Sequence, residues 1–591
     1  MKNKIIRGIP VSPYLTIGKA FIYLPKDTTL KRLKRGDNID GEISLFENTR
    51  KKSLGQLVEL KSELKKLPSS QPARLIDVQI LFLQDPSFLE DVEKRIRSDE
   101  ESAEGAIIKF LESAERDFKD IPSSYIGERY FDVKDVGDRL ISNLHNEEVS
   151  EEVKMGLKGS NNIVVAKRLS PSETVQMKNS DKINGIITEL GGKTSHIAII
   201  AEALNIPAVV GVNGLLDEIK SGDEVIVDGI SGIIVIDPNE KTKRKFKQKE
   251  KEAKRIREEF FKGKELPATT IDGYSIDIAA NIELPMEISC IKKYGAKGVG
   301  LLRTEFLYLT SDSIPDEEVQ YRFYSKVADI CSPDYVIVRT FDLGGDKIFK
   351  TKIKEEANPF LGWRGIRFAL SNEGIFRTQL RAILRVSAKG NIRLLIPMVS
   401  TVEEMIKVRR IVGEIMEELR TEGQSFDENI EIGAMVEIPS ICLLADRFTE
   451  VVDFFSIGTN DLTQYTLAVD RGNKRVSKLY DHLAPSVIKL MKMTVEQAHQ
   501  NHKWVGVCGE IAGDLVAVPL LIGLEVDEFS VPPSFIPQIK NVIRGLSLKE
   551  AKELLGQAEK KESAIEVRGF LKDELLKRFP SLKNILVEVE K

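Results

Sequence analysis

The sequence predicts a multidomain α/β protein, in which a β/α domain is interrupted by a helical bundle and followed by a (β/α)8 TIM-type barrel. The apolar pattern changes from strand-like to helical near residue 35 and back again near residue 150. A charged segment over 239–265 separates this first half from the rest. Beyond it, eight apolar strand candidates alternate with helical patterns, which is typical of such a barrel.

Length and composition indicate a large soluble enzyme. At roughly 150 residues per domain, 591 residues predict three or four domains. Lys and Arg total 87 and Asp and Glu total 91, a net charge of −4, so no overall field favours nucleic acid or an anionic membrane as a partner. No apolar stretch suggests membrane insertion. The four cysteines are scattered and lack metal-site spacing: Cys290, Cys331, Cys442 and Cys508. We therefore expect a cytoplasmic location.

The first predicted domain is discontinuous, formed by residues 1–34 and 150–238. Its opening part contains short apolar runs such as Ala20–Leu24. Its second part contains five strand candidates bounded by turn residues, at 162–166, 185–188, 208–210, 224–227 and 232–236.

The intervening residues 35–149 lack strand alternation and show apolar residues at helical spacing with charged faces, which predicts an inserted helical domain. The segments 75–85 and 125–140 are two of its predicted helices. Most of their apolar residues are expected to pack in the core of this bundle.

Residues 239–265 are rich in Lys, Arg and Glu and predict a charged linker helix. A basic run of this kind could instead contact RNA or lipid. The interspersed Glu250, Glu252, Glu258 and Glu259 favour a solvated helix with ion pairs along its faces. We expect this helix to let one domain move relative to another.

The predicted barrel domain covers residues 266–591, with strands near 275–281, 298–303, 335–340, 392–397, 431–437, 453–458, 504–508 and 527–531. Polar residues stand at or just after the ends of these strands. The carboxyl ends of barrel strands form one rim, where such enzymes hold their active sites. We therefore expect the following side chains to share that rim: Arg303, Arg339, Glu437, Asn460, Asp461 and Cys508.

The segment Thr188–Ala201 sets His196 behind the small residues Gly191–Ser195 and ahead of a predicted helix over Ile197–Leu204. Small residues let backbone N–H groups approach an anion, and the positive end of the helix favours one. His196 is the predicted chemical centre. A nucleotide-binding P-loop would need glycine where Ile187 stands, and a buried capping histidine is the other alternative.

This segment looks like the phosphohistidine loop of enzymes that pass a phosphoryl group from phosphoenolpyruvate onto a swivelling histidine domain. The chain resembles the Enzyme I family of bacterial sugar phosphotransferase systems from end to end, from Gly8–Pro13 to Val507–Glu510. It departs from the family at Tyr14, where glycine is usual, and at Gln79, where histidine is common. These departures concern a turn and a polar contact near the swivelling loop.

The resemblance implies that Arg303, Arg339 and Arg471 bind phosphoenolpyruvate. A guanidinium group suits this substrate because it binds a carboxylate or a phosphate through paired hydrogen bonds. Arg364 is implied in the same role, with a structural ion pair as the alternative.

Glu437 and Asp461 look like the magnesium ligands of the family. Magnesium commonly takes one or two protein carboxylates together with water and substrate oxygens. The resemblance implies that Asn460 hydrogen-bonds to the substrate, although an Asn-Asp pair also forms turns. Cys508 is implied as the thiol that protonates the departing enolate to give pyruvate.

The resemblance therefore implies transfer from phosphoenolpyruvate to His196 and on to a histidine of the phosphocarrier protein HPr, which would dock on the helical domain. It also implies a homodimer formed through the barrel. A related dikinase or synthase would need a nucleotide-binding domain, for which the chain has no room. A regulatory module that only binds phosphoenolpyruvate would not need His196, both carboxylates and Cys508 together.

Overall fold

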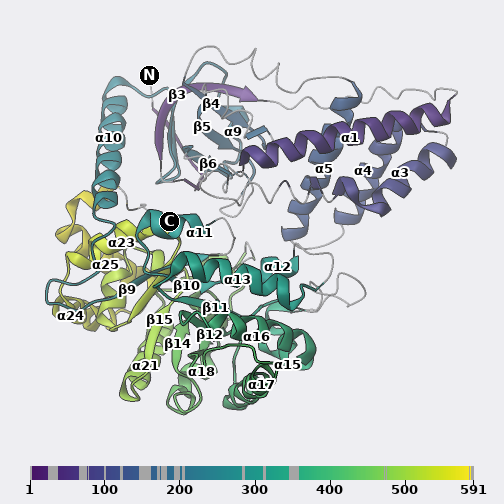
Figure 1. Cartoon of the computed structure of the whole chain (residues 1–591). Coiled ribbons are helices and arrows are strands. Elements are labelled where there is room, and N and C mark those ends of the chain that lie inside the picture. The colour runs from purple at the N-terminus through teal and green to yellow at the C-terminus, as the bar shows by residue number, and fades with distance from the viewer. Residues whose placement is uncertain are drawn as a thin grey trace. The chain divides into compact units, whose positions relative to one another are not determined.

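The structure is a computed structural model that describes residues 3–12, 14–23, 38–64, 76, 79–80, 82–98, 101–119, 124–145, 161–169, 173–174, 183–191, 197, 200–201, 206–282, 287–309, 314–344, 358–471, 473, 475–584 and 586. The chain divides into two compact units, one of Met1–Lys254 with Asn584–Lys591 and one of Arg255–Lys583 (Figure 1).

The first unit contains an eight-stranded sheet in the order β1-β8-β7-β3-β4-β5-β6-β2. Its strands are β1 (Lys4–Arg7), β2 (Ile9–Pro10), β3 (Leu15–Tyr23), β4 (Asn162–Ala166), β5 (Ile183–Thr188), β6 (Ala208–Val210), β7 (Glu224–Asp228) and β8 (Ile233–Ile236). Strands β3 to β6 are parallel, and the outer pairings are antiparallel.

Strand β3 pairs with β4 on one side and β7 on the other, so segments before and after the helical stretch form one sheet. This confirms the predicted β/α fold with a helical insertion; the residue boundaries of the domains stay predictions. Tyr14 is not among the described residues with positive φ, so its turn does not require the glycine usual in the family.

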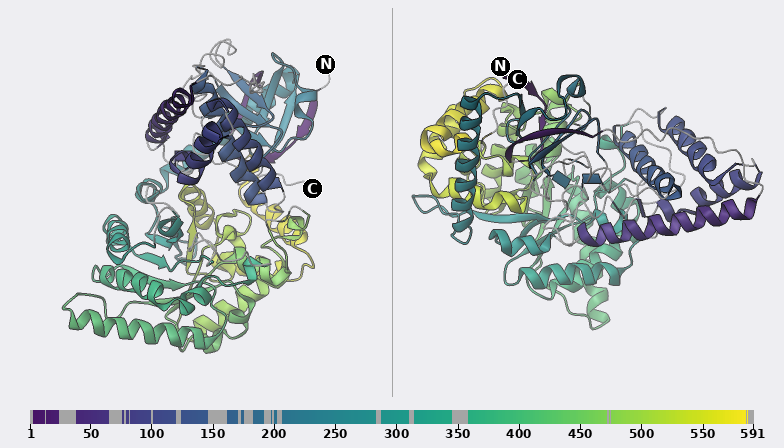
Figure 2. Two further views of the ribbon diagram at one scale, coloured as in Figure 1. Left: turned by 90° about the vertical axis from the view of Figure 1, so that its right-hand side faces the viewer. Right: turned by 90° about the horizontal axis from the view of Figure 1, so that it is seen from above.

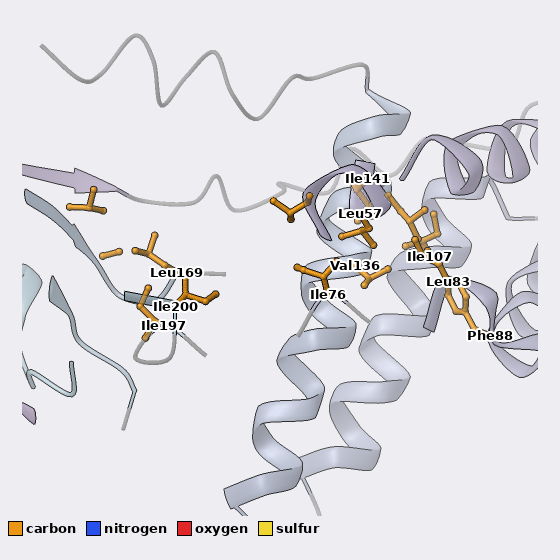
Figure 3. Packing of buried hydrophobic residues seen from close by; sticks show 14 of the residues in the cluster. Leu57, Ile76, Leu83, Phe88, Ile107, Val136, Ile141, Leu169, Ile197 and Ile200 are labelled. Atoms are coloured by element: carbon orange, nitrogen blue, oxygen red, sulfur yellow. The ribbon is translucent and has the colours of Figure 1, made fainter. Parts of the chain in front are cut away.

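The inserted helices are α1 (Ile39–Leu64), α3 (Pro86–Ser98), α4 (Ala103–Lys119) and α5 (Ser124–Leu144), and they run together as a bundle in Figure 2. Figure 3 shows their buried side chains in one group and Leu169, Ile197 and Ile200 in a second group near the sheet. Gln79 is buried among these helices, and its amide donates to Asp135 Oδ2 at 2.5 Å. A polar contact therefore persists where the family commonly has histidine.

The predicted charged helix is α10 (Glu240–Lys262). Its part up to Ala253 is attached to the sheet, because Phe246 and Ala253 pack in a small cluster with Leu15 and Ile230. Lys249 adds an ion pair of 2.6 Å with the buried carboxylate of Asp228.

The second unit is built on a closed barrel of eight parallel strands (Figure 1). They are β9 (Asp277–Ile282), β10 (Val299–Leu302), β11 (Val336–Arg339), β12 (Ile392–Ile396), β13 (Ile432–Val436), β14 (Phe454–Ile457), β15 (Trp504–Val507) and β16 (Glu528–Val531). Each overlaps its predicted range, and β16 closes the barrel by pairing with β9. The predicted (β/α)8 barrel is confirmed.

Helices cover this barrel and occupy its connections: α11 (Ile288–Tyr294), α12 (Glu305–Leu309), α13 (Glu317–Cys331), α15 (Ile366–Ser371), α16 (Glu373–Ser387), α17 (Val402–Thr421), α18 (Pro439–Leu443), α19 (Ala445–Phe448), α20 (Thr459–Leu467), α21 (Pro485–Gln500), α22 (Val518–Gly523), α23 (Ile536–Arg544), α24 (Leu548–Ala558) and α25 (Ala564–Arg578). A short helix, α9 (Leu215–Glu218), lies in the first unit. Local sequence fixes several of the barrel helices: Thr401 and Glu404 form a capping box on α17, and Asp316 caps α13.

Within the described part of the chain, no helix combines the length and apolar character needed to span a membrane.

Candidate active site

The polar residues predicted at the barrel rim lie at the carboxyl ends of their strands. Arg339 is the last residue of β11, and Arg303, Glu437 and Cys508 directly follow β10, β13 and β15. Asp461 lies in the first turn of α20, just beyond β14. Parallel strands in a closed barrel bring these ends together on one face.

Asp342 lies at the centre of the site, with a side chain only 3% exposed. Arg364 donates to both of its oxygens, from Nε at 3.0 Å and from Nη2 at 2.6 Å. Arg339 Nη1 is 3.7 Å from Oδ2. Burial alone would raise the pKa of Asp342, but the charges of Arg364 and Arg339 lower it below its ordinary value. Asp342 is therefore an anion that orders two arginines.

Glu305 holds Arg339 from the other side. Its Oε1 accepts from Arg339 Nη2 at 2.7 Å and from the backbone N–H of Asp342 at 2.9 Å. Burial by itself would lower the pKa of Arg339, but Glu305 and Asp342 raise it overall. The guanidinium group is thus kept charged and fixed in direction.

Glu437 is 2% exposed, and its Oε1 accepts a hydrogen bond from the backbone N–H of Met398 at 2.5 Å. Met398 adopts a left-handed conformation with φ of 59°, which strains a residue other than glycine. Burial, with the like charges of Asp461 and Asp342, raises the pKa of Glu437 to about 8. The negative charge of the Glu437 carboxylate is therefore unfavourable at this position unless a cation neutralises it.

Asp461 completes the acidic side of the site. Its Oδ2 is 3.7 Å from Arg364 Nη2, and its buried Oδ1 has no hydrogen-bond partner among the described residues. A buried oxygen without a partner and a crowded neighbouring carboxylate are features that a divalent cation would satisfy.

No group of three or more His, Cys, Asp or Glu side chains in the described ranges is arranged to hold a metal by itself. The residues present fit a cation that takes two carboxylates and completes its shell with substrate and water, as magnesium does.

Cys508 is buried within the barrel, 4% exposed, in a cluster with Leu301, Ile337 and Met435 among others. Its Sγ accepts from the hydroxyl of Ser456 at 3.3 Å. Burial raises the pKa of the Cys508 thiol to about 11, against the lowering effects of Ser456 and nearby arginines. The thiol is therefore protonated at neutral pH, as a proton donor must be.

Asn460 and Arg471 lie at a more open part of the rim. Asn460 Oδ1 accepts from the backbone N–H of Glu510 at 2.8 Å. Arg471 is 38% exposed, and its Nη1 is 3.8 Å from Glu510 Oε1. Both residues therefore lie near Glu510. The side chain of Asn460 makes a structural hydrogen bond through its Oδ1.

His196 lies outside the described residues. The flanking Gly191 has φ of 129°, which favours glycine, and Ile197, Ile200 and Ala201 are helical and buried. The helical state of Ile197, Ile200 and Ala201 is the one predicted for the segment after the histidine.

Three site residues were not predicted from sequence. Asp342 stands close in sequence to the predicted Arg339, and Glu305 stands close to the predicted Arg303. An acid near a predicted buried arginine is a sequence signal that could have identified both. Met398 gives no such signal, because a left-handed backbone is not expected of methionine.

Comparisons with known proteins give consistent results. A model of the N-terminal part of PEP-utilising enzymes matches residues 7–129, one of their mobile domain matches 158–232, and one of their PEP-binding domain matches 257–548.

Among curated relatives, a phosphoenolpyruvate-protein phosphotransferase of Staphylococcus aureus (strain MRSA252) is 37% identical, covering 94% of this chain and 97% of the relative. One of Haemophilus influenzae is 38% identical, covering 97% and 99%. A solution structure of Enzyme I (nEIt) is 32% identical and covers 42% of this chain and 98% of its own, with a TM-score of 0.34.

Proposed function

The chain belongs to the phosphoenolpyruvate-protein phosphotransferases, and we propose that it transfers the phosphoryl group of phosphoenolpyruvate to His196 and from there to a histidine of HPr, releasing pyruvate. Transfer from phosphoenolpyruvate to a histidine is the first step of the sugar phosphotransferase system.

The observation that carries the proposal is the ordered arginine pair at the rim. Arg339 and Arg364 are both held by Asp342, and Glu305 fixes Arg339 further. Fixed guanidinium groups suit a rigid substrate with two anionic groups, one carboxylate and one phosphate, because little motion remains to be lost on binding. Arg303 and Arg471 extend this set of substrate-binding residues.

Glu437 and Asp461 would hold a divalent cation, which we assign as Mg²⁺. When bound, this ion offsets the negative charge that develops on the leaving enolate. The unpartnered Asp461 Oδ1 and the crowding of Glu437 support the assignment. Asn460 hydrogen-bonds to the substrate beside them.

His196 accepts the phosphoryl group as a neutral imidazole, which is nucleophilic near neutral pH. Cys508 then protonates the enolate carbon. The helical domain of residues 35–149 docks HPr, and the discontinuous domain of 1–34 and 150–238 carries His196 between the two partners. The linker helix over 239–265 permits this motion relative to the barrel domain of 266–591.

We further propose a homodimer formed through the barrel. Four leucines of the barrel unit are exposed and available to such an interface: Leu361, Leu443, Leu444 and Leu479. A cytoplasmic location belongs to the same proposal, and the four free cysteines support it because thiols stay reduced in that compartment.

The test is incubation with Mg²⁺ and phosphoenolpyruvate labelled in its phosphoryl group. We expect stoichiometric label at His196 that is labile in acid and stable in alkali, and its quantitative transfer to HPr. His196→Ala is expected to fold and remain unlabelled. Label in that variant, or on a serine or threonine, would show that the acceptor is wrong. Binding of phosphoenolpyruvate without any label would indicate a regulatory module instead.

A further inference from the structure

We propose that Ser456 is a positioning residue for the proton-transfer step, and that its hydroxyl group stabilises the Cys508 thiolate formed when the enolate takes its proton. This inference rests on the proposed role of Cys508 as proton donor. It assigns a function to a buried serine on the neighbouring strand.

The contact is direct and shielded from water. Ser456 is the third residue of β14 and fully buried, with 0% exposure. Its Oγ donates to Cys508 Sγ at 3.3 Å across the β14–β15 boundary. The two strands pair in parallel with Ser456 opposite Gly506. Cys508, two residues after Gly506, therefore points to the same face as Ser456 as its diagonal neighbour.

The chemistry creates a charge at this sulfur. In the step, the S–H bond of Cys508 breaks, a C–H bond forms at the methylene carbon of the enolate, and the electron pair of the S–H bond remains on sulfur. The products are pyruvate and a buried thiolate, which regains a proton from water after pyruvate leaves. A hydrogen bond to a charged acceptor is stronger than one to a neutral acceptor. The Ser456 hydroxyl therefore stabilises the thiolate more than the thiol.

The other groups around the sulfur do not replace this hydrogen bond. The carbonyl of Ile457 lies 3.6 Å from Sγ and accepts from the thiol, so it disfavours a thiolate. The charge of Glu437 also disfavours it, whereas Arg339 and Arg303 favour it through space. Bound phosphoenolpyruvate would engage these arginines, which leaves the hydroxyl of Ser456 as a donor dedicated to the sulfur.

The backbone of Cys508 is fixed independently of Ser456. Its N–H donates to the carbonyl of Ile457 at 3.0 Å. Its carbonyl accepts from Asn281 Nδ2 at 3.2 Å, and Asn281 is held in turn by Ser530 at 2.6 Å. Removal of the Ser456 hydroxyl is therefore expected to leave the sulfur in place and to delete one hydrogen bond.

The experiment compares two rates in the full-length Mg²⁺-loaded enzyme. Formation of phospho-His196 is followed by rapid quench, and pyruvate release is followed by reduction to lactate. We expect Ser456→Ala to form phospho-His196 within about twofold of the parent rate and to release pyruvate about tenfold more slowly, since one pKa unit of lost thiolate stabilisation corresponds to tenfold. Ser456→Thr, which keeps the hydroxyl, is expected to restore pyruvate release.

A second measurement reports on the thiolate itself. Alkylation at Cys508 by iodoacetamide, quantified on its peptide between pH 8 and pH 11, requires the thiolate. We expect Ser456→Ala to slow it about tenfold at a given pH, since one pKa unit is a tenfold change in thiolate. Ser387→Ala removes another fully buried hydroxyl, at the end of α16, and is expected to leave both measurements unchanged.

The outcomes separate this inference from the proposed function. If Cys508→Ala released pyruvate at the parent rate, Cys508 would not be the donor. If Cys508→Ala were slow and Ser456→Ala were normal in pyruvate release and alkylation, the role of Ser456 would be refuted. Equal slowing of phospho-His196 formation and pyruvate release in Ser456→Ala would also refute it, because that pattern indicates a general structural defect.

Discussion

Arg364 and Asp342 form a two-point ion pair, with Nε–Oδ1 at 3.0 Å and Nη2–Oδ2 at 2.6 Å, although 22 residues of chain separate them. Asp342 is also within reach of Arg339. This carboxylate therefore determines the direction of two guanidinium groups that we assign to the substrate.

The first prediction concerns this pair. Asp342→Ala leaves two buried arginines without their shared anion, and removal of one member of a buried ion pair costs about 3–5 kcal/mol. We expect a loss of that size in the free energy of unfolding of the barrel, together with a marked loss of phosphoenolpyruvate binding. Both tryptophans, Trp363 and Trp504, lie in the barrel unit, so tryptophan fluorescence during urea unfolding reports on it.

Glu428→Ala is the matched control, because Glu428 is 68% exposed and pairs with Arg420 at 3.1 Å on the surface. We expect a change below about 1 kcal/mol there. Equal destabilisation by the two variants would show that Asp342 has no special part in the site.

Some features of the fold and of the site follow from the local sequence, and others depend on tertiary contacts. The barrel strands were predictable because each is a short apolar run, and the rim positions of Arg339, Glu437 and Cys508 were predictable because these residues end such runs. Their roles in the site stay predictions. The partner of Asp342 was not predictable, since Arg364 stands 22 residues further along the chain and no local pattern links the two residues. The contact of Ser456 with Cys508 depends on the register between β14 and β15, which the sequence does not state.

The second prediction concerns Glu437→Gln. Glutamine keeps the oxygen that accepts the Met398 N–H but removes a carboxylate that Asp461 and Asp342 repel. We therefore expect the metal-free variant to melt at the parent temperature or above it. Loss of a metal ligand worth several kcal/mol is expected to reduce labelling of His196 at least about 100-fold.

Glu431→Gln provides the control for this prediction. Glu431 stands just before the amino end of β13, whereas Glu437 follows its carboxyl end, and it pairs with Arg393 at 2.5 Å. We expect Glu431→Gln to label His196 at the same rate as the parent. Undiminished Mg²⁺-dependent labelling by Glu437→Gln, measured by rapid quench, would rule out Glu437 as a metal ligand.

The third prediction concerns pH and Glu528, which lies at the start of β16 and is 2% exposed. Burial raises its pKa from 4.5 to about 7, against the lowering effects of the hydrogen bond from Tyr335 and the charge of Arg393. A raised carboxyl pKa means that the folded state holds the proton more tightly than the unfolded state. Its contribution to stability is therefore present below pH 4.5 and is lost as pH rises to about 7.

We expect the parent to lose up to about 3 kcal/mol of barrel stability across that window from this residue. Glu528→Gln keeps an acceptor for the Tyr335 hydroxyl and removes the titration. Its free energy of unfolding is therefore expected to fall less than that of the parent across this pH window, by that amount. Tryptophan fluorescence in urea at several pH values measures both profiles. Parallel profiles for the parent and Glu528→Gln would contradict the prediction.

The last prediction divides the two half-reactions between two fragments. His196 precedes the linker helix, and all proposed phosphoenolpyruvate and metal residues follow it. Because Ala253 packs with Leu15 and Ile230, the first fragment must extend to Lys254 to keep its helix attached. We expect residues 1–254 to fold, to accept phosphate back from phosphorylated HPr, and to remain inert towards phosphoenolpyruvate at any Mg²⁺ concentration.

The complementary fragment begins at Arg255, because Phe261 contacts Tyr294 within the barrel unit at a ring separation of 5.9 Å. It is expected to bind phosphoenolpyruvate in calorimetry without becoming phosphorylated. A mixture of the two fragments is expected to transfer slowly, because the linker no longer supplies a high effective concentration of one domain near the other. Efficient labelling of residues 1–254 by phosphoenolpyruvate alone would show that the substrate site lies in the first unit, and the assignment of the barrel rim would then be wrong.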